Sequence, residues 1–96
     1  MQLARFLNNV FKKDGFILVD ANSKSYIIGN PKSENPIKVK ILNKNLHYKL
    51  LFHPDLYFGE AYTDGEITIE NGTLADFLDL SLMNFGRGDL IFFIYL

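Results

Sequence analysis

The segment from Gly59 to Glu66 is where side chains capable of acid–base chemistry lie closest together in the sequence. Glu60, Asp64 and Glu66 put three carboxylates within seven residues, and such groups serve general acid–base catalysis or bind a cation. On a helix, Glu60 and Asp64 would share a face and repel each other. The simpler interpretation is a solvated turn, because Asp64-Gly65 is a turn signal.

Other catalytic patterns are weak or absent. None of the seven glycines precedes a Lys-Ser or Lys-Thr pair, so there is no phosphate-binding loop. The sequence has no cysteine, which excludes disulfides and thiolate zinc sites. His53, Asp55 and Glu60 form only a weak candidate metal set. We therefore expect no catalytic, cofactor-binding or metal-binding residue, and an autonomous enzyme that uses the acidic segment is the least favoured interpretation.

The first half of the chain predicts one helix and three strands. Two β-favouring runs at residues 16–19 and 26–28 flank a turn-rich segment and predict a hairpin. Residues 37–41 alternate β-branched residues with lysines, which predicts a strand with one solvated face. Lys12 and Lys13 are expected in the last turn of the first helix, which is indicated by apolar residues at helical spacing: Leu3, Phe6, Leu7, Val10 and Phe11.

The second half predicts three helices around one strand. Asn43 is expected to cap a helix that ends before Pro54, where the next helix begins. Residues 66–70 alternate with an acidic outer face. Thr73 and Asp76 resemble a capping box, and the helix they start should place Leu74, Phe77, Leu78 and Leu82 on one face. The order α-β-β-β-α-α-β-α predicts a single α+β domain over residues 1–96, with a mainly antiparallel sheet of about four strands and three to four helices.

One part of the sequence resembles a known family. Residues 58–66 read Phe-Gly-Glu-Ala-Tyr-Thr-Asp-Gly-Glu, and a short strand and Leu-Ala-Asp-Phe-Leu at residues 74–78 follow. This pattern resembles the N-terminal domain of cyclopropane-fatty-acyl-phospholipid synthases, which belong to a wider group of S-adenosylmethionine-dependent methyltransferases. The resemblance extends over residues 3–83. The chain departs from the family at Thr63, where Met is usual, and at Ile67, where Trp is common.

The resemblance implies a non-catalytic accessory domain in a partial chain. In the family, such a domain precedes a methyltransferase domain that binds S-adenosylmethionine and methylenates an acyl-chain double bond of a phospholipid. The glycine-rich cofactor loop and the H-Y-D-x-G-N-D-F signature of that second domain are missing here. The implied partners are therefore the methyltransferase domain or a second copy of the chain. The family motif is the candidate interface: Gly59, Glu60, Ala61, Tyr62, Asp64, Gly65 and Glu66.

Charge is segregated along the chain. The net charge of −1 combines nine basic and three acidic residues in 1–50 (+6) with one basic and eight acidic residues in 51–96 (−7). This argues against a uniformly basic nucleic-acid-binding protein. An alternative function is a free-standing module that binds the membrane surface, with phospholipid headgroups contacted by Lys12, Lys13, Lys38 and Lys40. If strands 37–41 and 66–70 are neighbours, however, their opposite charges partly neutralise each other.

No segment of the sequence is long enough to span a membrane. The longest apolar run, residues 90–96, has seven residues, where about 20 are needed. We expect a cytoplasmic location, with contact to the inner membrane surface limited to peripheral association. We expect the run itself to form a last strand or to be covered by the missing domain.

Overall fold

The computed structural model describes residues 1–52 and 54–84. Our expectations for His53 and for residues 85–96 lie outside the described residues. Four helices and four strands occur within the described ranges, in the expected order. They are α1 (Gln2–Val10), β1 (Gly15–Val19), β2 (Ser25–Gly29), β3 (Lys38–Ile41), α2 (Asn45–Phe52), α3 (Pro54–Thr63), β4 (Ile67–Glu70) and α4 (Leu74–Asn84). The predicted α+β class is confirmed.

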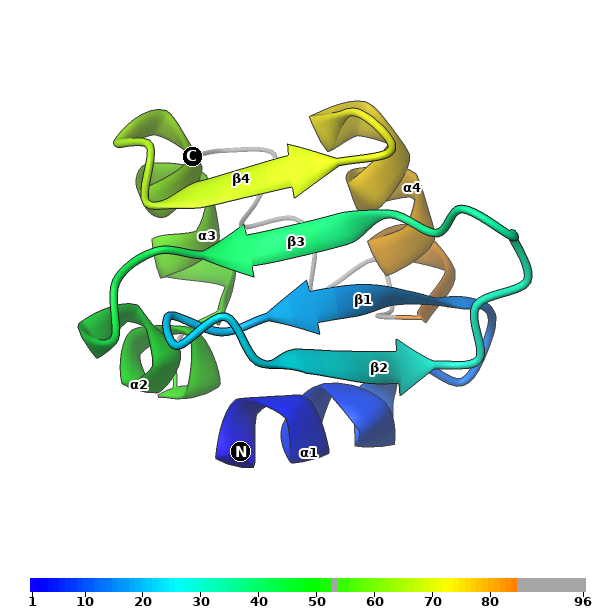
Figure 1. Ribbon diagram of the computed structural model, residues 1–96, viewed down its shortest axis with the longest axis horizontal. Helices are drawn as coiled ribbons and strands as arrows, with labels where there is room; N and C mark the ends of the chain where they lie inside the picture. The colour runs from blue at the N-terminus through cyan, green and yellow to red at the C-terminus, as the bar shows by residue number, and fades with distance from the viewer. Residues whose placement is uncertain (53, 85–96) are drawn as a thin grey trace.

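The four strands form one sheet in the order β2-β1-β3-β4. The β1–β2 and β3–β4 pairs are antiparallel, and the central β1–β3 pair is parallel. The parallel pair arises because residues 30–37 lead the chain from the end of β2 past β1 (Figure 1). In the same view α2, α3 and α4 lie behind the sheet and α1 runs along the β2 edge, so no described helix covers the front face (Figure 1).

The core lies between the sheet and the helices. Phe16 of β1 contacts Phe11 edge-on, with ring centroids 5.0 Å apart, and Phe77 of α4 edge-on at 5.1 Å. Phe58 of α3 stacks on Phe77 at 5.2 Å. Aromatic pairs of this kind contribute about 0.5–1.5 kcal/mol each beyond the area they bury. The aromatic residues therefore join α3, α4 and the residue that follows α1 to β1.

The α1 helix ends earlier than the sequence predicts. Its last residue is Val10, and Phe11 adopts an extended conformation, so the prediction that Lys12 and Lys13 lie in the last turn is wrong. The physical reason is burial: Phe11 is only 2% exposed, and the chain leaves the helix to place this ring in the core. Lys12 still contacts the helix, because its Nζ lies 3.4 Å from the Asn8 carbonyl oxygen.

Asn84, at the end of α4, holds the α1–β1 connection in place. Its Oδ1 accepts hydrogen bonds from the backbone N–H groups of Lys12 and Lys13, at 2.8 and 2.7 Å. Its Nδ2 donates to the carbonyl oxygens of Lys13 and Leu80, at 2.8 and 2.9 Å. A single amide thus uses both of its polar atoms to join segments about 70 residues apart in the sequence.

The capping box predicted for α4 is confirmed, whereas its buried face differs from the prediction. The Thr73 N–H donates to Asp76 Oδ2 at 2.9 Å, and the Asp76 N–H donates to Thr73 Oγ1 at 3.1 Å. Leu82 is 47% exposed, and Leu80 lies in the core instead. The core side of α4 follows the spacing of Phe77, Leu80 and Ser81, which the leucine-rich sequence of this helix conceals.

Asn8 of α1 pairs with the outer edge of β2. Its Oδ1 accepts from the Gly29 N–H at 2.8 Å, and its Nδ2 lies 3.3 Å from the Ile27 carbonyl oxygen. These backbone groups face away from β1, so the amide takes the place of a neighbouring strand's peptide group. Within the described residues, no helix is long and apolar enough to cross a membrane.

Candidate functional site

The sheet surface away from the helices is the candidate functional site, and we call it the open face. Strand alternation assigns to it Ile17, Val19, Ser25, Ile27, Lys38, Lys40, Thr68 and Glu70, of which Val19 is only 8% exposed. One row crosses all four strands in register, from Ile27 to Ile17, Lys38 and Glu70. Ile27 is 65% exposed. The open face is therefore apolar over β2 and β1 and charged over β3 and β4.

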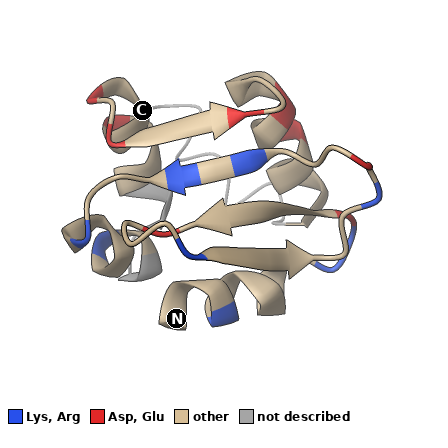
Figure 2. Ribbon diagram, in the orientation of Figure 1, with Lys and Arg blue, Asp and Glu red and all other residues tan. Residues whose placement is uncertain are grey.

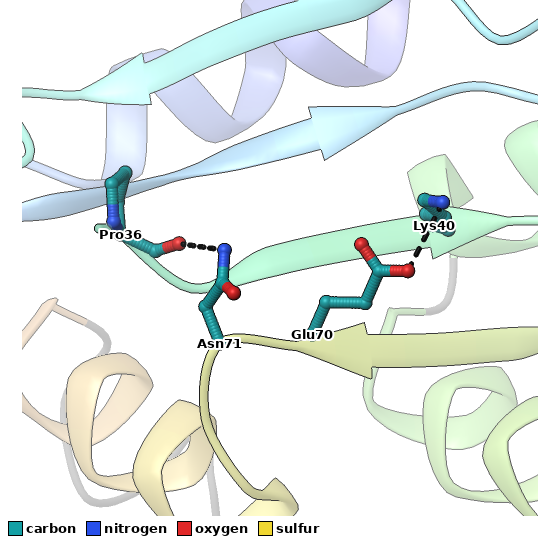
Figure 3. Close-up of polar contacts among 4 residues, drawn as sticks. All are labelled: Pro36, Lys40, Glu70 and Asn71. Atoms are coloured by element: carbon teal, nitrogen blue, oxygen red, sulfur yellow. Dashed lines mark hydrogen bonds and ion pairs between the residues drawn. The ribbon is translucent and has the colours of Figure 1, made fainter.

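The charged half of the open face confirms that strands 37–41 and 66–70 are neighbours. Lys40 Nζ lies 3.1 Å from Glu70 Oε1 (Figure 3), and the two side chains are 38% and 45% exposed. The residue directly opposite Glu70 is Lys38, so the ion pair forms on the diagonal. Among the described residues Lys38 has no ion-pair partner.

Asn71 fixes the adjoining end of this strand pair. It follows β4 with a φ of 62°, and its Nδ2 donates to the Pro36 carbonyl oxygen at 3.2 Å (Figure 3). Asn is one of the few residues other than Gly that adopts this left-handed conformation readily. The bond ties the turn after β4 to the residues before β3 and so fixes the geometry of the open face.

The family-like segment forms the end of α3 and the turn into β4. The Glu66 N–H donates to the Ala61 carbonyl oxygen at 2.9 Å, and the Gly65 N–H donates to that of Tyr62 at 3.2 Å. Together with the left-handed Gly65, at φ 77°, these bonds form a Schellman C-cap. Ala61 is buried at 2% exposure, which anchors the helix end on the core.

Two carboxylates of this segment are exposed to solvent and the third makes a structural hydrogen bond, as the turn interpretation predicts. Glu60 and Asp64 are exposed, and Glu66 Oε1 accepts a hydrogen bond from Asn43 Nδ2 at 3.1 Å. Gly59 and Glu66 are half-buried, and Tyr62 is partly exposed. No cluster of three or more potential metal ligands occurs in the described part of the chain. The arrangement closes a helix and begins a strand.

We compared the chain with protein-family models, curated proteins and solved structures, and none of them matches it.

The four candidate lipid-contacting lysines fall into two separate pairs. Lys38 and Lys40 belong to the open face, whereas Lys12 and Lys13 lie in the connection that Asn84 of α4 binds from the helix side of the sheet. Acidic residues gather along β4 and the adjoining ends of α3 and α4, and basic residues lie mainly on β3 and the elements below it (Figure 2). The charge segregation in the sequence is thus also a segregation in space.

Sequence reasoning missed the polar cluster around Asp20, which closes the β1–β2 hairpin. Asp20 is 8% exposed, and burial alone would raise the pKa of its carboxyl group. Hydrogen bonds from the backbone N–H groups of Lys24 and Asn22 oppose this effect. The Tyr26 hydroxyl group and nearby His47 act in the same direction, so the pKa of Asp20 is lowered from its ordinary value. The signal available in the sequence was an Asp at a strand end, which is typical of Asx turns.

His47 of α2 connects this hairpin to the helical layer. Its Nε2 accepts a hydrogen bond from the Ala21 N–H at 3.3 Å. Nε2 is thus the acceptor in this bond, which leaves Nδ1 as the other ring nitrogen that can carry a proton. His47 therefore positions the hairpin turn, and that role accounts for a polar residue on the inner side of α2.

The core contains an apolar cavity of about 50 Å³. It is lined by residues of the sheet and the helices, among them Leu18, Val39, Phe58 and Phe77, with Ser81 as the polar exception. An apolar cavity that holds one benzene molecule measures about 150 Å³. This core cavity is therefore too small to hold a phospholipid acyl chain.

Proposed function

We propose that the chain is the non-catalytic accessory domain of a methyltransferase similar to cyclopropane-fatty-acyl-phospholipid synthases. The observation that supports this function best is the open face. There the exposed Ile27 and Lys38, which has no ion-pair partner among the residues that the structure describes, lie on either side of the half-buried Ile17. Such a mixed surface on an otherwise packed domain is suited to contact with another protein domain. S-adenosylmethionine would be bound by that other domain.

The role of the family-like segment is consistent with this proposal. Its residues Ala61, Gly65 and Glu66 cap α3 and lead the chain into β4, so the motif supports the fold.

The proposal is tested on the polypeptide that cells make from the natural gene. An antibody against this domain should detect a polypeptide, or a stable complex, that contains a methyltransferase domain. Ile27→Asp in that product should reduce the methylated or cyclopropanated fraction of membrane phospholipid. Leu82→Asp, which places the same charge on an exposed residue of α4, should leave this fraction near the wild-type value. A product that neither contains nor binds a methyltransferase domain contradicts the proposal.

The spatial separation of charge favours a second candidate, a peripheral membrane-surface module. Either Lys38 on the open face or Lys12 and Lys13 on the helix side of the sheet would contact anionic lipid at the inner membrane surface, where each lysine contributes about 1 kcal/mol. Co-sedimentation with anionic vesicles should then weaken as salt is raised. Equal binding to neutral and anionic vesicles would reject this candidate.

A further inference from the structure

We infer that the open face binds an acidic amphipathic helix of a partner protein. The inference rests on the proposed function and deepens it, because it names the element that the accessory domain would contact. It concerns the residues Ile17, Ile27 and Lys38, which adjoin one another across β1, β2 and β3.

The dimensions of the open face fit one helix. Strands are about 4.8 Å apart, and a helix with its side chains is about 10–12 Å wide, so a helix lying over β1 covers β2 and β3 as well. The five residues of β1 span about 17 Å, the length of about 11 helical residues. A helix of three turns therefore covers this part of the sheet.

The side chains of the open face specify the chemistry of that helix. Ile27 and Ile17 call for an apolar stripe directly above β2 and β1. On the β3 side, Lys38 has no ion-pair partner among the described residues, whereas Lys40 is held by Glu70 at 3.1 Å. Covering Lys38 with an apolar residue would bury an unpaired charge at a large cost. An acidic residue beside the apolar stripe removes that cost.

A second copy of this chain does not fit the same face. A symmetric contact brings the same patch of both subunits together. With the two-fold axis along the strands, the isoleucines of β1 and β2 would lie over the charged residues of β3 and β4. With the axis across the strands at Val39, Lys38 of one copy would lie over Lys40 of the other. The first orientation places apolar residues against charged ones, and the second places like charges against each other. Both are unfavourable, which favours a different, acidic partner.

The test uses the 96-residue chain and two synthetic helical peptides of about 14 residues. Both peptides have leucines at positions i, i+3, i+4 and i+7, and they differ only in flanking residues, Glu in one and Lys in the other. Titration by calorimetry should show binding of the Glu peptide at least about tenfold tighter than that of the Lys peptide. Amide NMR shifts should change at Ile17, Ile27 and Lys38.

Two variants with matched controls complete the test. Ile27→Asp should weaken binding of the Glu peptide at least about tenfold, whereas Leu82→Asp on α4 should leave it unchanged. Lys38→Glu should reverse the preference between the peptides, whereas Lys13→Glu, with the same net charge, should preserve it. Circular dichroism checks that each variant is folded. Ile27 and Lys38 both project from the sheet surface, so their replacement should leave the core intact.

Several outcomes would overturn the inference. These are equal affinity for the two peptides, shift changes confined to the helices or to the β4 edge, or a dimer of the chain that Ile27→Asp converts to a monomer. The proposed function is judged separately. Peptide binding without any associated methyltransferase domain would reject the proposed function and leave the helix-binding face standing.

Discussion

Replacement of Asn84 by alanine tests whether one amide holds α4 to the α1–β1 connection. The Asn84 side chain makes four hydrogen bonds of 2.7–2.9 Å, and three of them reach Lys12 and Lys13 across the fold. Each intramolecular hydrogen bond contributes about 0.5–1.5 kcal/mol net, and partly exposed ones lie at the lower end. We therefore expect Asn84→Ala to lower the free energy of unfolding by about 2–3 kcal/mol.

Urea denaturation followed by circular dichroism measures this change. A loss of this size should lower the melting temperature by about 10–20 °C, since 1 kcal/mol corresponds to about 4–8 °C in a domain of this size. Asn84→Asp keeps the acceptor oxygen but places a carboxylate oxygen against the carbonyl oxygens of Lys13 and Leu80, so its loss should be at least as large as that of Asn84→Ala. Asn9→Ala, at an exposed position of α1, should stay within about 0.5 kcal/mol of wild type. A loss below about 0.5 kcal/mol for Asn84→Ala would refute the reasoning.

Three further predictions concern other polar contacts. Thr73→Ala should lower the free energy of unfolding by about 1 kcal/mol because the capping box with Asp76 is lost, whereas Thr73→Ser should keep most of this stability. Equal thermal melting of Thr73→Ala and wild type would argue against the cap. Asp20→Asn should destabilise the chain by about 1–3 kcal/mol at pH 7. Because the folded-state pKa of Asp20 is lowered, its contribution is fully present above the unfolded pKa and is lost as the pH falls through the folded pKa, so the two stability curves should converge in acid. A double-mutant cycle with Lys40→Met and Glu70→Gln should give a coupling of at most about 0.5 kcal/mol that fades at high salt, because both side chains are well exposed.

The order of elements was predictable because their signals are local. Alternation at residues 37–41, the capping box at Thr73 and the turn at Asp64-Gly65 each depend on a few adjacent residues, and the structure contains all three. The strand order was not predictable in this way. Whether Lys38 lies opposite Glu70 depends on where residues 30–37 lead the chain, and that path is set by packing across the whole sheet.

The parts that sequence reasoning missed depend on long-range contacts. Asn84 and Asn8 look like ordinary polar residues of helices, yet each bonds to backbone groups far away in the chain. The α1 helix ends earlier than predicted because burial of the Phe11 ring in the core is more favourable than one more helical residue. The charged half of the open face was predicted from the solvated faces of residues 37–41 and 66–70. Its apolar half was missed, since alternation in β2 places Ile27 outward only once its partner strand is known.

The contact between Asn8 and β2 has a consequence for how the chain avoids self-association. An uncovered strand edge is a template on which another chain can add a strand, which is how ordered aggregates begin. The β2 sequence, Ser-Tyr-Ile-Ile-Gly, is rich in β-favouring residues and uncharged. By occupying the Gly29 N–H and facing the Ile27 carbonyl oxygen, a nine-residue helix at the start of the chain closes this edge. Release of α1 would expose the β2 edge to the addition of a strand.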